Sequence, residues 1–122
     1  MTIRVMLFLF GMLLAAGSRA ADLPLWQPVA GNENVEYAFK RGSCQVAEYV
    51  SCIEQRIVKA THTVSFAIAI IRRDTCVKGF GKLATTTLDG EKVLGSSDVV
   101  AGGQSIASTE FDFLCLLATT ST

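Results

Sequence analysis

The sequence predicts a small α+β domain, a mainly antiparallel β-sheet with a C-terminal α-helix, stapled by disulfides. Several segments alternate apolar and polar residues with a period of two, which is typical of half-buried strands. Asp89 and Gly90 separate two extended runs, which is the pattern of a β-hairpin. Apolar residues recur at helical spacing near the C-terminus, and four cysteines follow the N-terminal leader.

The first 20 residues have the layout of a secretory signal peptide. Arg4 gives a positive start, an apolar run follows, and small residues precede a cut after Ala20. The run is shorter than the roughly 20 residues that a membrane span needs, so we favour a cleaved leader over an uncleaved anchor. We therefore expect a signal peptide at residues 1–20, a single domain at residues 21–122, and no stable membrane span after cleavage.

Charge argues against a nucleic-acid partner. Eleven basic and eleven acidic residues balance over the whole chain, but Arg4 and Arg19 lie in the leader. The mature domain is therefore slightly acidic, whereas a nucleic-acid binder needs clustered excess Lys and Arg. Half of the residues are apolar, which is enough for a packed core.

All four cysteines, Cys44, Cys52, Cys76 and Cys115, belong to the predicted mature domain. An even number in a small exported chain favours two disulfides over buried free thiols. Zinc fits poorly because the chain has no C-x₂-C pair. Three pairings are open; pairing 44 with 52 and 76 with 115 needs one local bend and one long-range tie.

In the N-terminal half, Val35, Tyr37 and Phe39 alternate with other residues and predict a strand at residues 35–40. Residues 44–60 permit a helix, from their apolar spacing, or strands, from their dense Val, Ile and Tyr. In one straight helix Cys44 and Cys52 would lie about 12 Å apart, beyond the roughly 7 Å that a disulfide tolerates. We favour two strands around a bend at residues 48–51.

Residues 64–70 are the clearest strand, with large apolar side chains on one face and small ones on the other. The small face indicates that another element packs closely there or that solvent covers it thinly. Strands are expected at residues 83–88 and 91–94 around the Asp-Gly turn, and residues 95–97 are expected to turn the chain before a short strand at 99–100.

The C-terminal segment predicts an amphipathic helix with Cys115 on its buried face. Ser105 or Ser108 would cap its start. The alternative is a final strand in which Phe111, Phe113 and Cys115 share a face. The helical prediction rests on the spacing of Ala107, Phe111, Leu114, Cys115 and Ala118.

Motifs for catalysis are weak. Residues 79–84 match G-x-G-x-x-A, but a dinucleotide loop needs a preceding parallel strand and a following helix, so we interpret them as a glycine turn or bulge. His62 is the only imidazole and is expected in an exposed turn. Glu110 and Asp112 are expected to be solvated or capping. We predict no enzyme activity and no catalytic, cofactor-binding or metal-binding residues.

Aromatic side chains are the candidates for partner binding, with core or lid packing as the alternative. Two basic pairs, Lys40 with Arg41 and Arg72 with Arg73, would form a patch if their strands adjoin, or else a solvated edge that guards against strand pairing. The aromatic candidates are Trp26, Tyr37, Tyr49 and Phe80.

Short runs over much of the mature part follow a common pattern: Trp26 with VAGNENVE at 29–36, CVKGFGKL at 76–83, DVVAGG at 98–103, IAS at 106–108, and Cys115. With these runs the chain resembles small exported bacterial proteins of the surface-adhesin E type. The resemblance implies an antiparallel sheet with a C-terminal helix tied back by a disulfide, here between Cys76 and Cys115. Cys44 and Cys52 lie outside that pattern. The resemblance also implies a surface-interaction role, since some such proteins adhere to host matrix, and it brings no catalytic residues.

The sequence therefore predicts an exported, non-enzymatic binding or surface-interaction protein, in the periplasm or at the cell surface. Its partner would be a protein or an envelope component, met by the sheet face or the groove between helix and sheet. The alternative is a periplasmic inhibitor or immunity protein against a toxic hydrolase, which needs a protruding loop at residues 79–82 or 95–98. A small hydrolase is disfavoured because the chain lacks an evident nucleophile–base pair.

Overall fold

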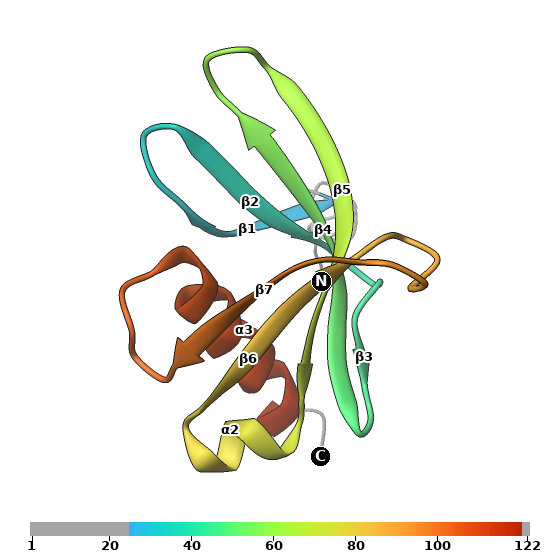
Figure 1. Cartoon of the computed structure of the whole chain (residues 1–122), viewed down its shortest axis with the longest axis vertical. Helices are drawn as coiled ribbons and strands as arrows, with labels where there is room; N and C mark the ends of the chain where they lie inside the picture. The colour runs from blue at the N-terminus through green and yellow to red at the C-terminus, as the bar shows by residue number, and fades with distance from the viewer. Residues whose placement is uncertain (1–24, 121–122) are drawn as a thin grey trace, which may run out of the picture.

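The computed structural model describes residues 25–120 and confirms the predicted fold class (Figure 1). The expected leader at residues 1–20 lies outside the described residues. The elements are β1 (Trp26–Gly31), β2 (Val35–Lys40), β3 (Gln45–Val46), β4 (Tyr49–Val58), β5 (Thr63–Arg72), α2 (Asp74–Lys78), β6 (Phe80–Thr86), β7 (Val93–Val100) and α3 (Ile106–Thr120).

The strands form one antiparallel sheet in the order β1-β2-β4-β5-β6-β7, and β3 also pairs with β4. β4 and β5 have ten residues each and pair along their whole length. β6 joins β5 only at residues 68–70. The sheet therefore splays: the turn of the β1–β2 hairpin and the far halves of β4 and β5 project upward in Figure 1, away from β6 and β7.

The core lies between α3 and one face of the sheet, which we call the inner face. α3 contacts β1, β4 and β7. The small-residue face of residues 64–70 belongs to this side. Ala69 is fully buried there, whereas Ser65 is exposed, so the expected close packing holds at the Ala69 end and the alternative, solvent, at the Ser65 end. Val64 and Phe66 point to the outer face and stay about half exposed. The buried apolar core consists of Phe39, Val50, Cys52, Ala69, Ile71, Leu83, Val99, Phe111, Leu114 and Ala118.

Both disulfides form, and no cysteine among the described residues is free. Cys44–Cys52 closes the β3–β4 hairpin with a Cα–Cα distance of 4.1 Å, so residues 44–60 are strands rather than a helix. Cys76–Cys115 joins α2 to α3, with a Cα–Cα distance of 5.3 Å. The bend lies at residues 47–48 instead of the expected 48–51, because residues 49–51 already pair with β5.

The predicted C-terminal helix is confirmed as α3. The Ser105 hydroxyl accepts a hydrogen bond from the Ser108 N–H at 3.0 Å, which is the expected cap. The Ser108 hydroxyl accepts instead from the N–H of Val100 in β7 at 3.1 Å. The start of α3 is thereby joined to the last strand of the sheet.

The predicted turn at residues 95–97 is wrong, and the predicted glycine turn after Cys76 is confirmed only at Gly79. Residues 95–97 lie inside β7 and pair with residues 83–85 of β6. Only Gly79 in the glycine-rich segment adopts a left-handed conformation, with φ 86°, and it ends α2; residues 80–82 are strand. In both places the β6–β7 ladder supplies backbone hydrogen bonds that outweigh local turn preference. Residues 79–82 and 95–98 therefore offer no protruding loop, and the inhibitor hypothesis stays a prediction with no loop assigned to it.

The hairpin around Asp89 and Gly90 is confirmed, but its connection is longer than two residues. The N–H of Thr87 donates to the carbonyl of Lys92 at 2.9 Å, and the Asp89 carboxylate accepts from the N–H of Glu91 at 3.0 Å. The strands around it consequently end at Thr86 and begin again at Val93, inside the predicted limits.

Gly81→Ala is expected to destabilise the protein because β6 passes directly under α2. A Cβ on Gly81 would lie 2.7 Å from the Cβ of Thr75, which is itself buried. Relieving that clash must shift α2, and we expect a loss of about 1–3 kcal/mol in thermal unfolding. Gly95→Ala is the matched control, since its Cβ would meet only the Thr85 hydroxyl at 3.5 Å. Equal losses in the two variants would contradict this packing.

Candidate functional site

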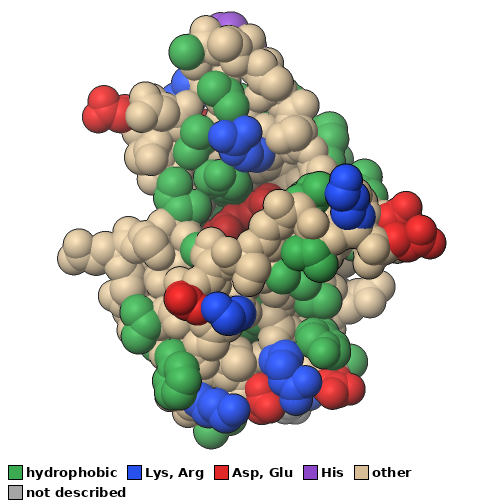
Figure 2. Space-filling model, in the orientation of Figure 1, with side chains coloured by type: hydrophobic (Ala, Val, Ile, Leu, Met, Phe, Trp, Pro, Cys, Tyr) green, Lys and Arg blue, Asp and Glu red, His purple; other side chains and the backbone are tan. Residues whose placement is uncertain are grey.

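A cleft opens on the inner face where α3 no longer covers the sheet; we call it the inner cleft. It consists of two adjoining cavities of about 270 and 410 Å³. Figure 2 shows the hollow between the upper hairpins and the lower part of the molecule, with acidic atoms at its floor. Both cavities are lined by Tyr37 of β2, Glu54 of β4 and Thr85 of β6.

Two glutamates form the floor of the inner cleft. Glu54 and Glu110 of α3 are each only 3% exposed. Their carboxyl groups hydrogen-bond to each other, and the Oε2 atom of each has no hydrogen-bond partner within the described part of the chain. Two carboxyl groups in direct contact cannot both ionise without strong repulsion, so the pair holds a proton.

The environment decides where that proton lies. Burial, the hydrogen bond with Glu54 and the negative charge of Glu54 raise the pKa of Glu110 to about 10. Burial also raises the pKa of Glu54, although the hydrogen bond from Glu110 and the positive charge of Arg56 oppose the rise. Glu110 is therefore the protonated member at neutral pH, and its O–H donates to the carboxylate of Glu54.

The expectation that Glu110 is solvated or capping is wrong, because it faces the sheet beside the core residues of α3. Glu54 was not singled out from the sequence at all. A signal for it exists: it continues the buried alternation of Val50 and Cys52 along β4. Asp112, the other expected polar group, accepts from the N–H of Gly102 at 3.0 Å on an exposed surface.

Arg56 is the positive group beside the inner cleft. It is exposed and follows Glu54 by two positions on β4, so both side chains lie on the inner face. Its Nε donates to the hydroxyl of Tyr37 at 3.2 Å. Because Tyr37 belongs to β2, this bond directs the guanidinium toward β2, on the opposite side of β4 from β5.

The four aromatic candidates are not brought together. Tyr37 lines the inner cleft, whereas Trp26 lines neither of its cavities; the ring of Trp26 lies 5.6 Å from that of Phe66. Tyr49 is 45% exposed, with the Arg72 guanidinium 5.7 Å from its ring centre. Phe80 is 61% exposed at the start of β6. Of the four predicted partner-binding residues, all within the described part of the chain, Tyr37 alone lines the two cavities of the inner cleft.

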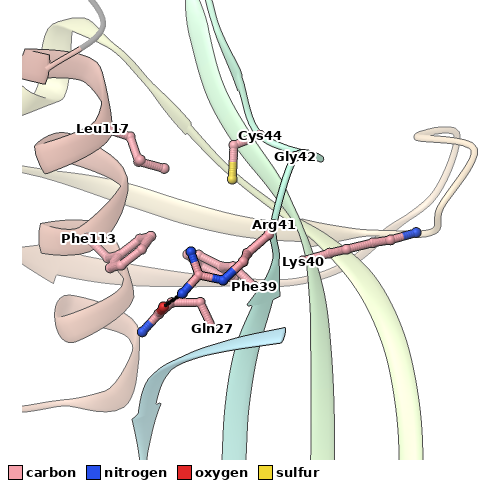
Figure 3. Close-up of a pocket in the computed structure, with 8 residues that line it drawn as sticks. All are labelled: Gln27, Phe39, Lys40, Arg41, Gly42, Cys44, Phe113 and Leu117. Carbon is pink, nitrogen blue, oxygen red and sulfur yellow. Dashed lines mark hydrogen bonds between the residues drawn. The ribbon is translucent and has the colours of Figure 1, made fainter. Parts of the chain in front are cut away.

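The two basic pairs do not form a patch, since β2 and β5 are separated by β4. Arg72 lies 3.1 Å from Asp74 and 3.8 Å from Glu48. Arg41 donates to the side chain of Gln27 beside a shallow recess of about 330 Å³ near the end of α3 (Figure 3). None of the residues that line this recess has a buried side-chain polar atom without a hydrogen-bond partner, so it is a weaker candidate than the inner cleft.

His62 lies in the predicted exposed turn, at the tip of the β4–β5 hairpin, with φ 56°. Within residues 25–120, no three His, Cys, Asp or Glu side chains come together as a metal site. In the same range, no helix is long and apolar enough to cross a membrane. No protein-family model, curated protein or solved structure matches this chain.

Proposed function

We propose that this protein is an exported, non-enzymatic binding domain that holds an extended segment of a partner protein along the open edge of β5. The edge consists of residues 63–67. These residues pair with β4 on one side, whereas β6 reaches β5 only from Ile68 onward. Unpaired N–H and C=O groups of a strand edge are a template for pairing with another chain.

The sequence of the edge is the observation that best supports this proposal. Proteins protect exposed edges with proline, charged side chains or bulges. The edge reads TVSFA, which has no proline and no charge, and its register with β4 is regular. Val64 and Phe66 are 45% and 47% exposed, so an added strand would also cover apolar surface.

The position of the edge gives a partner access to the inner cleft. Ser65, Phe66 and Ala67 of the edge line the cleft together with Leu94 of β7. The cleft offers hydroxyl and carboxyl groups, but His62 lies at the hairpin tip and supplies no base to them. This arrangement suits binding better than nucleophilic catalysis.

The disulfides support export to an oxidising compartment. Two bridges form in a small domain, and residues 1–20 have the layout of a signal peptide. The periplasm and the cell surface both meet this requirement. The partner is therefore an envelope protein or a protein that meets the cell surface.

Proline substitutions at neighbouring edge positions test the proposal. Backbone N–H groups along an antiparallel strand point alternately to its two sides. Of Ser65→Pro and Phe66→Pro, one therefore breaks the ladder with β4 and lowers the melting temperature. The other variant removes an N–H group from the open edge and leaves the melting temperature nearly unchanged. We expect wild-type protein to capture from envelope extracts a protein that this second variant does not.

The alanine substitutions Ser65→Ala and Phe66→Ala keep the N–H group and are the matched controls. Capture of the same protein by the thermally unaffected proline variant would contradict docking at the edge. Failure of the wild-type protein to capture any envelope protein would contradict the binding function itself.

A further inference from the structure

The two glutamates of the inner cleft indicate which kind of side chain a partner would place there. This inference rests on the proposed function. We propose that Glu54 and Glu110 bind a basic side chain, Lys or Arg, of the segment that pairs with the β5 edge. The carboxyl oxygens that have no hydrogen-bond partner, Oε2 of each glutamate, are the atoms that would accept its hydrogen bonds.

The geometry allows such a side chain to reach the glutamates. A strand added to β5 would lie two strand spacings, about 10 Å, from β4. On the inner face, the β5 residue between them is Ala67, which pairs directly with Glu54. Its methyl group leaves space above β5, and the larger cavity of the cleft borders both residues. A long side chain from the added strand can therefore cross β5 to Glu54.

The carboxyl groups at the floor of the inner cleft favour a ligand that donates hydrogen bonds. Ionised carboxylates are acceptors only, and a guanidinium or ammonium group offers several N–H donors together with positive charge. Arg56, whose positive charge acts on Glu54, donates a hydrogen bond to Tyr37 of β2, on the opposite side of β4 from the β5 edge. A metal ion fits less well, because no third acidic or imidazole ligand joins the two glutamates within the described residues.

Binding of a basic group should release the proton that the pair holds. The added positive charge stabilises both carboxylates in their ionised form. The other titratable groups that face the pair are Arg56 and Tyr37; the adjoining residues of β5, β6 and β7 are Ala67, Thr85 and Ser97. Affinity should therefore rise with pH while Glu110 remains protonated in the unbound protein.

The test compares two blocked pentapeptides, Thr-Val-Arg-Val-Thr and the same peptide with citrulline, which has the shape of arginine without its charge. We expect the oxidised protein to bind the arginine peptide about tenfold more tightly than the citrulline peptide at pH 7. This preference should increase with pH between about pH 5 and about pH 8, by up to about tenfold per pH unit. Calorimetry in buffers of different ionisation enthalpy should report about one proton released per peptide bound.

Variants distinguish the effect of the glutamate charge on peptide binding from the effect of the shape of the cleft. The double variant Glu54→Gln with Glu110→Gln should lose the preference for arginine, and Glu110→Gln alone should abolish proton release. Ser97→Ala, which also alters the cleft lining, should keep both properties. A preference that survives in the double variant would overturn the proposal.

The outcomes also distinguish this site from the proposed function. If both peptides bind equally and shift the backbone amide signals of residues 63–67, the edge binds chains and the cationic site is wrong. If neither peptide binds at millimolar concentration, the cationic site is likewise wrong, and the proline variants decide separately whether the edge binds a partner.

Discussion

Cys115→Ala is expected to cause the largest loss of stability of any single substitution considered. It opens the Cys76–Cys115 disulfide, which spans a sequence separation of 39 residues and ties α3 to the helix that follows β5. In the chain-entropy account, such a bridge contributes about 4 kcal/mol by restricting the unfolded chain. Small domains have total stabilities of about 5–15 kcal/mol, so the variant should be largely unfolded or melt far below the wild type.

Circular dichroism during thermal unfolding, under oxidising conditions, measures this effect. Cys44→Ala is the comparison, since the Cys44–Cys52 bridge spans a separation of only 8 residues. The same entropy account assigns that bridge about 2.5 kcal/mol, and its loss leaves α3 tied to α2. Equal losses from Cys115→Ala and Cys44→Ala would contradict the role assigned to the longer bridge.

Glu110→Gln is expected to stabilise the protein at neutral pH and to flatten its pH dependence. Burial raises the pKa of Glu110 from its ordinary value of 4.5 to about 10, so the folded protein binds this proton more tightly than the unfolded chain. The contribution of this proton to the free energy of unfolding is therefore fully present below about pH 4.5. It is lost as the pH rises toward 10. A glutamine keeps an N–H donor for Glu54 without a titrating proton.

The size of the effect follows from about 1.4 kcal/mol per pH unit, which gives up to about 3 kcal/mol at pH 7. For a domain of this size, that is a rise in melting temperature of about ten degrees or more. Wild-type melting temperatures should fall between about pH 5 and about pH 9, and those of the variant, which keeps only the raised pKa of Glu54, should fall less. Glu36→Gln is the control, because Glu36 is exposed and forms only a surface pair with Lys59.

A wild-type melting temperature that is constant over this range would contradict the buried pair. A Glu110→Gln variant that melts lower than the wild type would do the same. If Glu110→Gln raises the melting temperature as predicted, the pair of Glu54 and Glu110 lowers the stability of the unbound protein. A destabilising pair at the floor of an open cleft is then consistent with a binding role, since functional groups often persist at the expense of stability.

Glu54 and Glu110 should determine both the binding of a basic side chain and the pH dependence of stability. Glu54 pairs with Ala67 of the edge and contacts Glu110 of α3. A basic side chain bound there would reduce the repulsion that burial imposes on the two carboxyl groups. We therefore expect the arginine peptide to raise the melting temperature of the wild type more at pH 8 than at pH 5, by mass action on the folded state.

The sequence by itself determined the fold class, the strands around residues 35–40 and 64–70, the helix α3 and the exposed turn at His62. These features depend on local periodicity and residue preference, which a short window contains. The cysteine count also indicated a domain with two disulfides before any three-dimensional information, whereas the export predicted from residues 1–20 stays a prediction. For residues 44–60 the sequence showed that a straight helix and a bridge from Cys44 to Cys52 exclude each other, but the structure was needed to establish that bridge.

Only the tertiary structure decided the features on which the functional proposals rest. Residues 95–97 became strand because β6 lies beside them, and pairing outweighed their turn preference. Glu54 and Glu110 meet because α3 packs across β4, a contact between distant segments that no local pattern encodes. The β5 edge is open because the sheet splays where β6 leaves β5 at Ile68. Each depends on long-range packing, in which the free energy of burial and pairing exceeds local preferences.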